Sequence, residues 1–446
     1  MNRYLFAFLW IAGHAGAQQT PDPHAGHHME NMENMQNMTH DHAAMAGHHH
    51  MGSNEAGQFL MEEASGTSMN PQAWVTPMIG AKTGQWNWMF MGQAYLVDTQ
   101  QSGPRGGDKF YSPNWFMAAT EHSVGAGSIL FQFMGSLDPA TITDRRYPLL
   151  FQTGETAYGN ALTDAQHPHD LIMALGFHYA RPLGAKTRLE LYFAPVGDPA
   201  LGPVAFPHRA SAAELPQATL GHHWQDSSHI ANEVVTAGIS RGMFRLEASG
   251  FHGQEPNENR WNIDYGAIDS WSSRLSVSPS KNWMGQFSVG RLHHPEALEE
   301  GDIVRATASL HYSRPLTQGA WSTSLIWGRN HKTAEQRDSN SFTLESVAPL
   351  SRKNFITGRV ERVDKDELFD AQPELKASLQ RTAGVSFRVG AYTVGYTRDV
   401  QLMRFVETGI GANFTAYTLP RAIQPYYGSH PFGANVFVRF RLRPGE

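Results

Sequence analysis

Histidines and acids gather in two stretches of the chain, 164–170 and 208–233, in spacings that suit a metal ion. A His-x-His pattern in the first stretch and a His-His-x-x-Asp-x-x-His pattern in the second each offer two or three ligands from one segment. Imidazole and carboxylate groups bind first-row transition metals. The candidate ligands are His167, His169, Asp170, His222, His223 and His229. These spacings match no established zinc or iron signature.

Two alternatives use the same residues without a metal. Loops that fold into a barrel could use His, Asp and Arg to bind the backbone of other loops, because a buried plug must satisfy its polar atoms. A hydrolase would instead place a nucleophile beside a histidine, and Ser227-Ser228-His229 offers that pair on paper.

A second group of soft and borderline ligands precedes these stretches, between residues 24 and 51. Thioethers suit Cu(I) and imidazoles suit Cu(II), Zn(II) and Ni(II), and the chain has no cysteine to compete with them. The intervening Ala, Gly, Asn and Glu cannot bury a core, so this segment is expected to be disordered without metal. A low-complexity linker that binds metal only incidentally is the alternative. The candidate ligands here are His24, His27, His28, Met29, Met32, Met35, Met38, His40, His42, Met45, His48, His49, His50 and Met51.

The elements that must position the loop histidines are strands. Along 172–181, Met173, Leu175 and Phe177 share one face, and the residues between them share the other. Such period-two alternation predicts a strand rather than a helix. A hairpin-sized connection at 182–185 follows, whereas the loops on either side are long. Tight turns at one end and long loops at the other are typical of a transmembrane β-barrel.

The same alternation recurs to the C-terminus in segments whose length suits a tilted membrane-crossing strand. Seventeen segments are found, but bacterial barrels usually have an even number of strands. The prediction is therefore an antiparallel barrel of about 16 strands, with 18 as the alternative. The segments are 86–98, 110–121, 127–138, 172–181, 186–195, 232–241, 243–251, 268–279, 282–292, 303–314, 320–330, 340–348, 353–363, 380–389, 391–400, 405–418 and 433–442.

The face opposite the apolar one is expected to line the lumen. It carries both charge signs, which can satisfy each other as ion pairs, so strong ion selectivity is not expected. A soluble β-sandwich or propeller is the alternative fold, but it explains neither the loop asymmetry nor these charges. The predicted inward residues are Arg188, Glu190, Arg245, Glu247, Arg274, Arg305, Arg359, Glu361, Arg439 and Arg441.

The start of the chain predicts export. Arg3, an apolar stretch at 4–12 and the small residues Ala15-Gly-Ala17 form a signal peptide, residues 1–17. A disordered Met/His-rich tail is expected at 18–70 and the barrel at 71–446. The net charge of -6 argues against nucleic acid as a partner.

Several strings resemble an uncharacterised family of bacterial exported barrels, from about residue 64 to 442. They are Ser65-Gly-Thr-Ser68, Ser102-Gly-Pro-Arg-Gly-Gly-Asp108, Arg145-Arg-Tyr-Pro-Leu-Leu-Phe-Gln-Thr-Gly-Glu155, Gln166-His-Pro-His-Asp170, Ala194-Pro-Val-Gly-Asp-Pro-Ala-Leu-Gly202 and Gly250-Phe-His-Gly-Gln-Glu-Pro256. By layout, the chain also resembles the copper-resistance outer-membrane protein B family, which likewise sets a Met/His-rich segment ahead of a barrel. The first resemblance implies the fold, and the second implies copper handling.

Together these observations predict an outer-membrane barrel that binds or passes metal ions, with copper as the expected ion and a periplasmic tail that captures it. Membrane lipid, metal ions and periplasmic copper-handling proteins are the expected partners. No organic cofactor and no enzymatic activity are expected. A porin-like channel for small polar solutes is the first alternative, and a barrel hydrolase is the second.

Overall fold

A computed structural model describes residues 52–383 and 386–444, all within the unit His48–Glu446. The expected signal peptide, the metal-ligand candidates at 24–51 and most of the expected tail lie outside the described residues.

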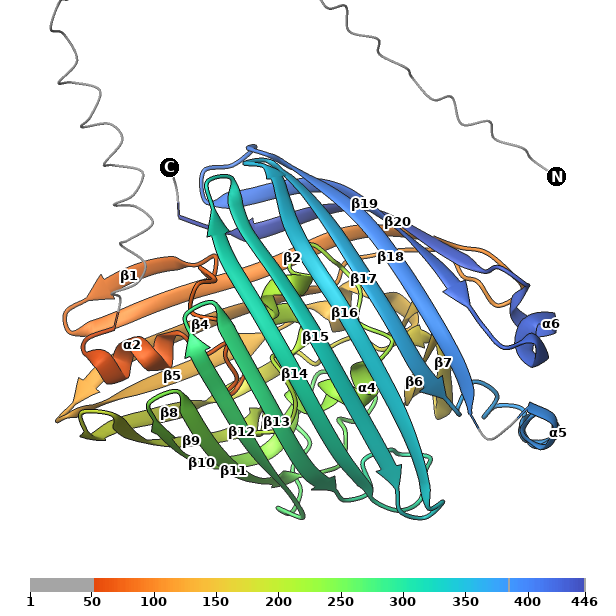
Figure 1. The fold of residues 1–446 in the computed structure, drawn as a ribbon, viewed down its shortest axis with the longest axis horizontal. Coiled ribbons are helices and arrows are strands. Elements are labelled where there is room, and N and C mark those ends of the chain that lie inside the picture. The colour runs from red at the N-terminus through yellow and green to blue at the C-terminus, as the bar shows by residue number, and fades with distance from the viewer. Residues whose placement is uncertain (1–51, 384–385, 445–446) are drawn as a thin grey trace, which may run out of the picture. The chain divides into compact units, whose positions relative to one another are not determined.

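Sixteen antiparallel strands form a closed barrel (Figure 1), which confirms the predicted fold and strand number. Each strand pairs with the next along the chain, and β2 pairs with β20, with Leu96 opposite Val438, to close the ring. The strands are β2 (Trp86–Gln101), β4 (Asn114–Val124), β5 (Gly127–Gly135), β8 (Ile172–Gly184), β9 (Thr187–Gly197), β10 (Ala231–Arg241), β11 (Phe244–His252), β12 (Ser270–Ser280), β13 (Trp283–Leu292), β14 (Ile303–Leu316), β15 (Gly319–Lys332), β16 (Arg337–Ser351), β17 (Asn354–Lys365), β18 (Phe387–Val400), β19 (Val406–Thr418) and β20 (Phe432–Leu442).

Shorter elements accompany the barrel. Strands β1 (Ile79–Thr83) and β3 (Lys109–Tyr111) pair with β2, and β6 (Tyr147–Ala157) and β7 (Asn160–Gln166) form a separate two-stranded sheet. The helices are α2 (Glu55–Met61), α3 (Asp138–Thr141), α4 (His222–Gln225), α5 (Pro373–Ala383) and α6 (Gln424–Tyr427), with 3-10 turns at Thr143–Arg145, Phe206–His208, Ala210–Ala212, Ser227–His229 and Arg421–Ile423. Across the described residues, no helix is long and apolar enough to cross a membrane.

The two ends of the barrel differ, as the loop lengths predict. At the turn end, hairpins such as β10–β11 and β12–β13 are joined by two residues. At the loop end, residues 136–171 join β5 to β8 and residues 198–230 join β9 to β10. These two loops carry every predicted loop ligand, and they are long enough to fold back into the lumen.

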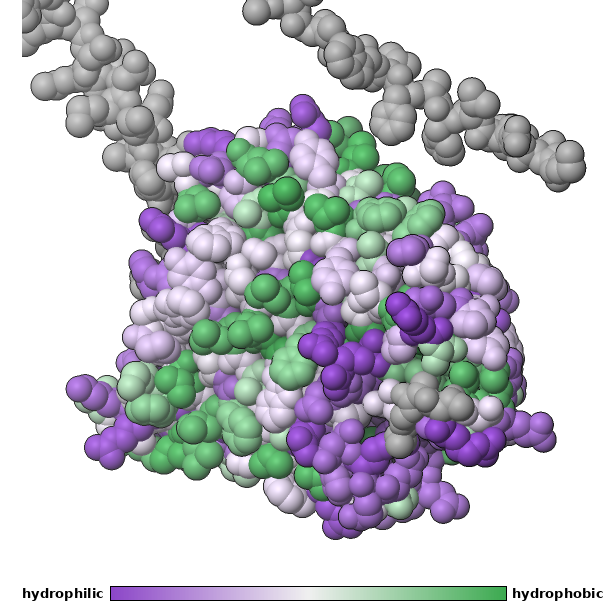
Figure 2. Space-filling view, turned by 45° about the vertical axis from the view of Figure 1, so that its right-hand side comes forward, coloured by the Kyte–Doolittle hydropathy of each residue, from purple (hydrophilic) through white to green (hydrophobic). Residues whose placement is uncertain are grey.

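Alternation along each strand separates an apolar outside from a polar inside. Outward side chains such as Leu246 and Leu325 are exposed by 53% and 54%. Figure 2 shows hydrophobic residues spread over the strand-covered part of one face and hydrophilic residues gathered toward its lower right. The prediction that ten charged residues face the lumen is confirmed, because nine of them are buried and only Arg188 is half-buried.

The prediction that residues up to 70 are disordered is wrong for residues 52–70, which fold. Helix α2 packs against β4, β5 and β8, with Phe59, Leu60 and Met61 buried. At the turn end, Ser53 donates to Glu121 on β4. The segment folds because its polar side chains match the charged wall; Glu63 pairs with Arg245 at 2.6 Å, for example.

The seventeenth predicted strand is also an error. Predicted segments 380–389 and 391–400 are one strand, β18, preceded by helix α5. Pro373 and Glu374 at the start of α5 are typical helix-starting residues, so the apparent alternation at 380–383 belongs to the end of a helix. Strands β6 and β7 escape prediction because their pairing is irregular, with two shifts of register.

Candidate functional site

Four histidines from the two long loops meet inside the barrel toward its loop end. His167 follows β7, His222 and His223 begin α4, and His229 ends the turn that follows α4. We call these four residues the histidine cluster. The ring centroids of His222 lie 5.2 Å from His223 and 5.3 Å from His229, and those of His167 and His223 are 5.9 Å apart.

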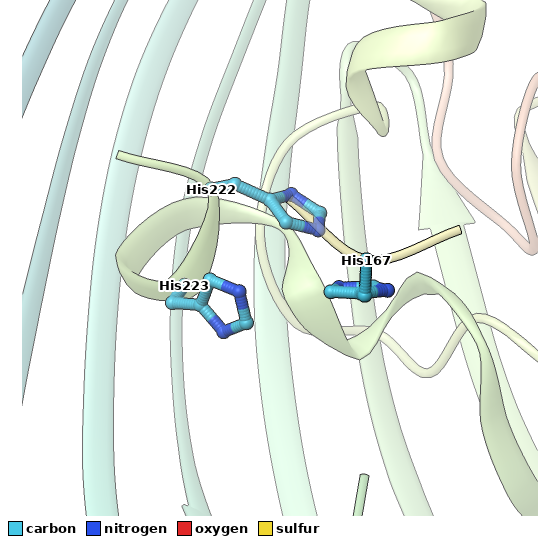
Figure 3. Close-up of side chains that lie close together, drawn as sticks. All are labelled: His167, His222 and His223. Atoms are coloured by element: carbon cyan, nitrogen blue, oxygen red, sulfur yellow. The ribbon is translucent and has the colours of Figure 1, made fainter. Parts of the chain in front are cut away.

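Three members of this cluster could share one ion. One ligand nitrogen from each of His167, His222 and His223 lies within 4.8 Å of the others, and all three residues are buried. Figure 3 shows the three rings grouped around a common space, with His167 on a separate segment from His222 and His223. Three imidazoles are a ligand set used by protein sites for zinc and copper.

The barrel wall fixes the turn that carries His222 and His223. Arg305 on β14 donates to the carbonyl oxygen of His223 at 2.6 Å, and Asn330 on β15 donates to the same oxygen at 3.0 Å. Trp224 donates its indole N–H to Ser339 on β16 at 2.7 Å. Contacts from three strands therefore position this short helix.

Asp226 orients His222. Its carboxylate lies 2.8 Å from Nδ1 of His222 and 3.3 Å from Arg209, and Arg209 in turn pairs with Glu345 on β16 at 2.8 Å. A carboxylate on one ring nitrogen fixes the tautomer and leaves the other nitrogen, here Nε2, as the electron-pair donor. His222 is thus held as a metal-ligating histidine would be.

The cluster also contains buried polar atoms that have nothing to bind. Among the described residues, neither ring nitrogen of His223 has a hydrogen-bond partner, and Nε2 of His229 has none either. His167 is better satisfied, since its Nε2 lies 2.8 Å from Glu155 and its Nδ1 lies 3.0 Å from the carbonyl of Pro168. Most buried polar atoms in proteins are partnered, so the exceptions at His223 point to a ligand.

Gly154 on β6 lets the ring of His223 approach the backbone. A Cβ placed at this glycine would lie 2.4 Å from Cε1 of His223, and its φ of +112° disfavours any other residue. Gly154 belongs to the string Arg145–Glu155, one of those that resemble the family of bacterial exported barrels.

Burial sets the protonation of the cluster. It lowers the pKa of His222 to about 4, against the opposing effect of Asp226, and it lowers the pKa of His229 well below its usual range. Burial also lowers the pKa of His167. These imidazoles are therefore neutral near pH 7, which is the form that binds metals.

The other predicted loop residues have separate roles. His169 pairs with Asp138 at 2.9 Å, although its ring lies 5.5 Å from that of His229. Asp170 pairs with Arg260 at 3.2 Å and belongs to none of the possible ligand groups found among the described residues. No hydrogen bond within the described residues joins Ser227 or Ser228 to His229. The serine–histidine dyad that a hydrolase would need is therefore not formed by these residues.

Three carboxylates beside the cluster are absent from the sequence-based candidates. Glu155 comes from β6, Glu255 follows β11 and Glu296 follows β13. Glu255 and Glu296 lie 3.6 Å and 3.9 Å from Nδ1 of His223. Two of the quoted strings contain Glu155 and Glu255, but a single acid in a loop gives no spacing signal, and Glu296 has no motif at all.

Comparison with known proteins assigns no activity. No family model and no curated protein sequence matches the chain. Among solved structures, the chain is similar to an anion-selective porin from Comamonas acidovorans, with 10% identity over 80% of this chain and 100% of the porin, at a TM-score of 0.48. It is similar to OmpF of Salmonella typhi in complex with daunomycin, with 8% identity over 82% and 100% of the chains and a TM-score of 0.49.

A third similar structure is the outer-membrane channel DcaP of Acinetobacter baumannii, with 6% identity over 82% of this chain and 100% of that chain, at a TM-score of 0.47. Likeness at this level assigns no function, so the residues of the lumen must support any proposal.

Proposed function

We propose that the chain is an outer-membrane β-barrel that binds a first-row transition metal ion at His167, His222 and His223. The convergence of these three buried histidines, with both nitrogens of His223 unpartnered, carries the proposal. Copper is the first candidate ion because of the Met/His composition at 24–51.

The outer surface supports the membrane part of the proposal. Outward leucines, valines and phenylalanines on consecutive strands are exposed, and some of them, such as Phe287 and Val394, are more than half exposed. Water would disfavour this exposure and lipid would not. In bacterial barrels the short turns face the periplasm. Ser53 lies at the turn end, so we propose that the Met/His-rich segment before it is periplasmic.

Metal content of the purified full-length protein tests the proposal. We expect copper or zinc to bind, and His222→Ala to remove about one equivalent per chain. His430→Ala, an exposed histidine on the β19–β20 loop, is the control and should bind as the unaltered protein does. Equal metal content in both variants would refute the lumen site.

A channel for small polar solutes is the second candidate, because a 16-stranded barrel is wide enough for an aqueous lumen. Two features oppose it: loops enter from the loop end, and residues 52–70 enter from the turn end and reach Asp198, the first residue of the β9–β10 loop, through Ser65 at 2.9 Å. We expect vesicles that contain the protein to exclude uncharged sugars. Swelling at the rate of an open porin would favour the channel over the metal site as the main function.

A further inference from the structure

A second group of possible ligands adjoins the histidine cluster and opens toward the loop end. It consists of His223, Glu255 and Glu296, which each offer one ligand atom within 4.8 Å of the others. We call this group the carboxylate site. It shares His223 with the histidine cluster, but its other members come from the β11–β12 and β13–β14 loops.

Two acidic side chains meet here, and Glu296 accepts a hydrogen bond from the backbone N–H of Glu155 at 3.4 Å. The side chain of Glu255 is 7% exposed and that of Glu296 is 14% exposed. Within the described parts of the chain, neither oxygen of Glu255 has a hydrogen-bond partner. The separations from Nδ1 of His223, 3.6 Å and 3.9 Å, exceed hydrogen-bond length. A buried carboxylate without hydrogen bonds costs several kcal/mol, roughly, unless a cation or a proton joins it.

The nearby cations are committed elsewhere. Arg305 donates to the carbonyl of His223, to Ser227 and to Asn330. Arg260 pairs with Glu155 and Asp170, and Lys332 pairs with Glu299, Asp366 and Glu367. Among the described residues, no lysine or arginine forms a direct ion pair with Glu255 or Glu296, and Arg305 attracts both only at longer range.

Two cavities lead to this site from the loop end. One of about 340 Å³ is lined by Glu155, Glu255, Glu258 and Glu296 among others. Another of about 600 Å³ is lined by Glu155, Glu296, Glu299 and Glu367 among others. Glu155 and Glu296 line both cavities, so a hydrated cation could reach the carboxylate site from either one, and acidic walls would concentrate it there.

We infer that His223, Glu255 and Glu296 form a second cation site, which takes a divalent ion that prefers oxygen ligands. Two carboxylates and one imidazole suit Mn²⁺ better than the three imidazoles of the neighbouring site, which suit copper or zinc. The inference extends the proposed function, because both sites use His223. Since a neutral imidazole has one electron pair, His223 serves one site at a time, and the lumen can bind either of two ions of different chemistry.

Mn²⁺ binding to the full-length protein in detergent micelles tests the inference, with free Mn²⁺ measured by electron paramagnetic resonance. The Met/His-rich segment should contribute little, because thioethers are poor ligands for this ion. We expect one Mn²⁺ per chain. Glu255→Gln and Glu296→Gln should each weaken binding by about tenfold or more, so the second variant serves if the first fails to fold.

The matched control is Glu258→Gln. Glu258 lines the same 340 Å³ cavity but is paired with Arg145 at 2.8 Å, so its loss should change Mn²⁺ affinity by less than about twofold. His222→Ala removes a ligand of the histidine cluster alone and should also leave Mn²⁺ binding in place. No Mn²⁺ binding by the unaltered protein, or equal binding by the Glu255→Gln, Glu296→Gln and control variants, would overturn the inference.

A copper titration of the same variants keeps the two proposals apart. Copper binding that depends on His222 while Mn²⁺ fails to bind would refute only the carboxylate site. Mn²⁺ binding that depends on Glu255 without copper binding that depends on His222 would refute only the proposed function.

Discussion

Two polar clusters share the lumen of this barrel, and they differ in how well their charges are matched. Toward the turn end, the arginine cluster comprises Glu63, Glu190, Arg245, Glu247 and Arg274. Arg245 pairs with Glu63 at 2.6 Å and also contacts Glu190, and Arg274 donates to Glu247 at 3.0 Å and to Thr67 at 2.7 Å. Toward the loop end, the side chains of His223 and Glu255 lack hydrogen-bond partners among the described residues.

The difference separates polar groups that satisfy one another within the protein from polar groups that, under the proposed function, bind an ion. A matched ion network satisfies itself and needs nothing from outside, whereas a buried histidine beside buried carboxylates gains most when an ion arrives. The first cluster also ties the N-terminal segment to the wall through Glu63. Substitutions in the two clusters should therefore affect different measurements.

The largest effect is expected from Arg245→Met. It leaves Glu63, Glu190 and Glu247 buried without their shared cation, and breaking such a pair costs about 3–5 kcal/mol of unfolding free energy. Urea unfolding followed by tryptophan fluorescence measures the loss, with unheated gel migration as a check of assembly. Arg352→Met, at an exposed residue in the turn between β16 and β17, should leave stability unchanged. Equal stability of both variants would show that the arginine cluster is not structural.

A smaller effect, confined to the histidine cluster, is expected from Gly154→Ala. The added Cβ would collide with the ring of His223 and move it, so metal affinity should fall by about tenfold. Gly159→Ala is the matched control, because Gly159 also has a positive φ, of +74°, but has no atom within 4 Å of a Cβ. Both variants carry the backbone penalty of about 1–3 kcal/mol, and only the first should lose metal. Equal metal affinity of the two would separate His223 from the site.

The sequence reveals the barrel because strand alternation is a local pattern. Each strand shows its own inside and outside, as the buried Arg305 and the exposed Leu310 do on β14. The histidines of the site are also visible, since His222 and His223 are adjacent and His167 has a close neighbour in His169. What the sequence cannot show is that Glu255 and Glu296, from different loops, end beside His223.

Residues 52–70 are misjudged for a related reason. Their composition of Ser, Thr, Glu and Gly is typical of a disordered segment, and nothing local reveals that charged strands will surround them. In the lumen, Thr67 accepts from Arg274 and Ser65 donates to Asp198, so these polar contacts add to the apolar packing of α2 in holding the segment. A polar composition usually predicts disorder, but it does not do so where the surrounding tertiary structure is itself polar.

Lowering the pH should reduce stability through the buried histidines, which gain a charge, but not through the arginines, which are charged throughout. Burial lowers the pKa of His208 to about 3, and its ring contacts Trp115 with centroids 4.3 Å apart. In the unfolded chain this pKa is about 6.5. The unfolded state therefore binds a proton first as pH falls, and stability should drop by about 1.4 kcal/mol per pH unit between pH 6.5 and 3. Urea unfolding at several pH values should show a shallower dependence for His208→Gln. An identical slope would mean that His208 is protonated within the folded barrel.

The smallest effect on the barrel is expected from deleting residues 24–51. This segment is predicted to bind Cu(I) through Met29, Met32, Met35 and Met38, and Cu(II) through its histidines, and its composition offers the barrel no core. Deletion should remove most copper equivalents and leave urea unfolding unchanged. Deleting 24–70 is the comparison, because it also removes α2 and Glu63 and should destabilise the barrel by leaving Arg245 without one of its carboxylates. If the shorter deletion destabilises the barrel as much as the longer one, the boundary between capture tail and plug lies earlier than residue 51. If copper binding survives the shorter deletion in full, the histidine cluster rather than the tail holds the copper.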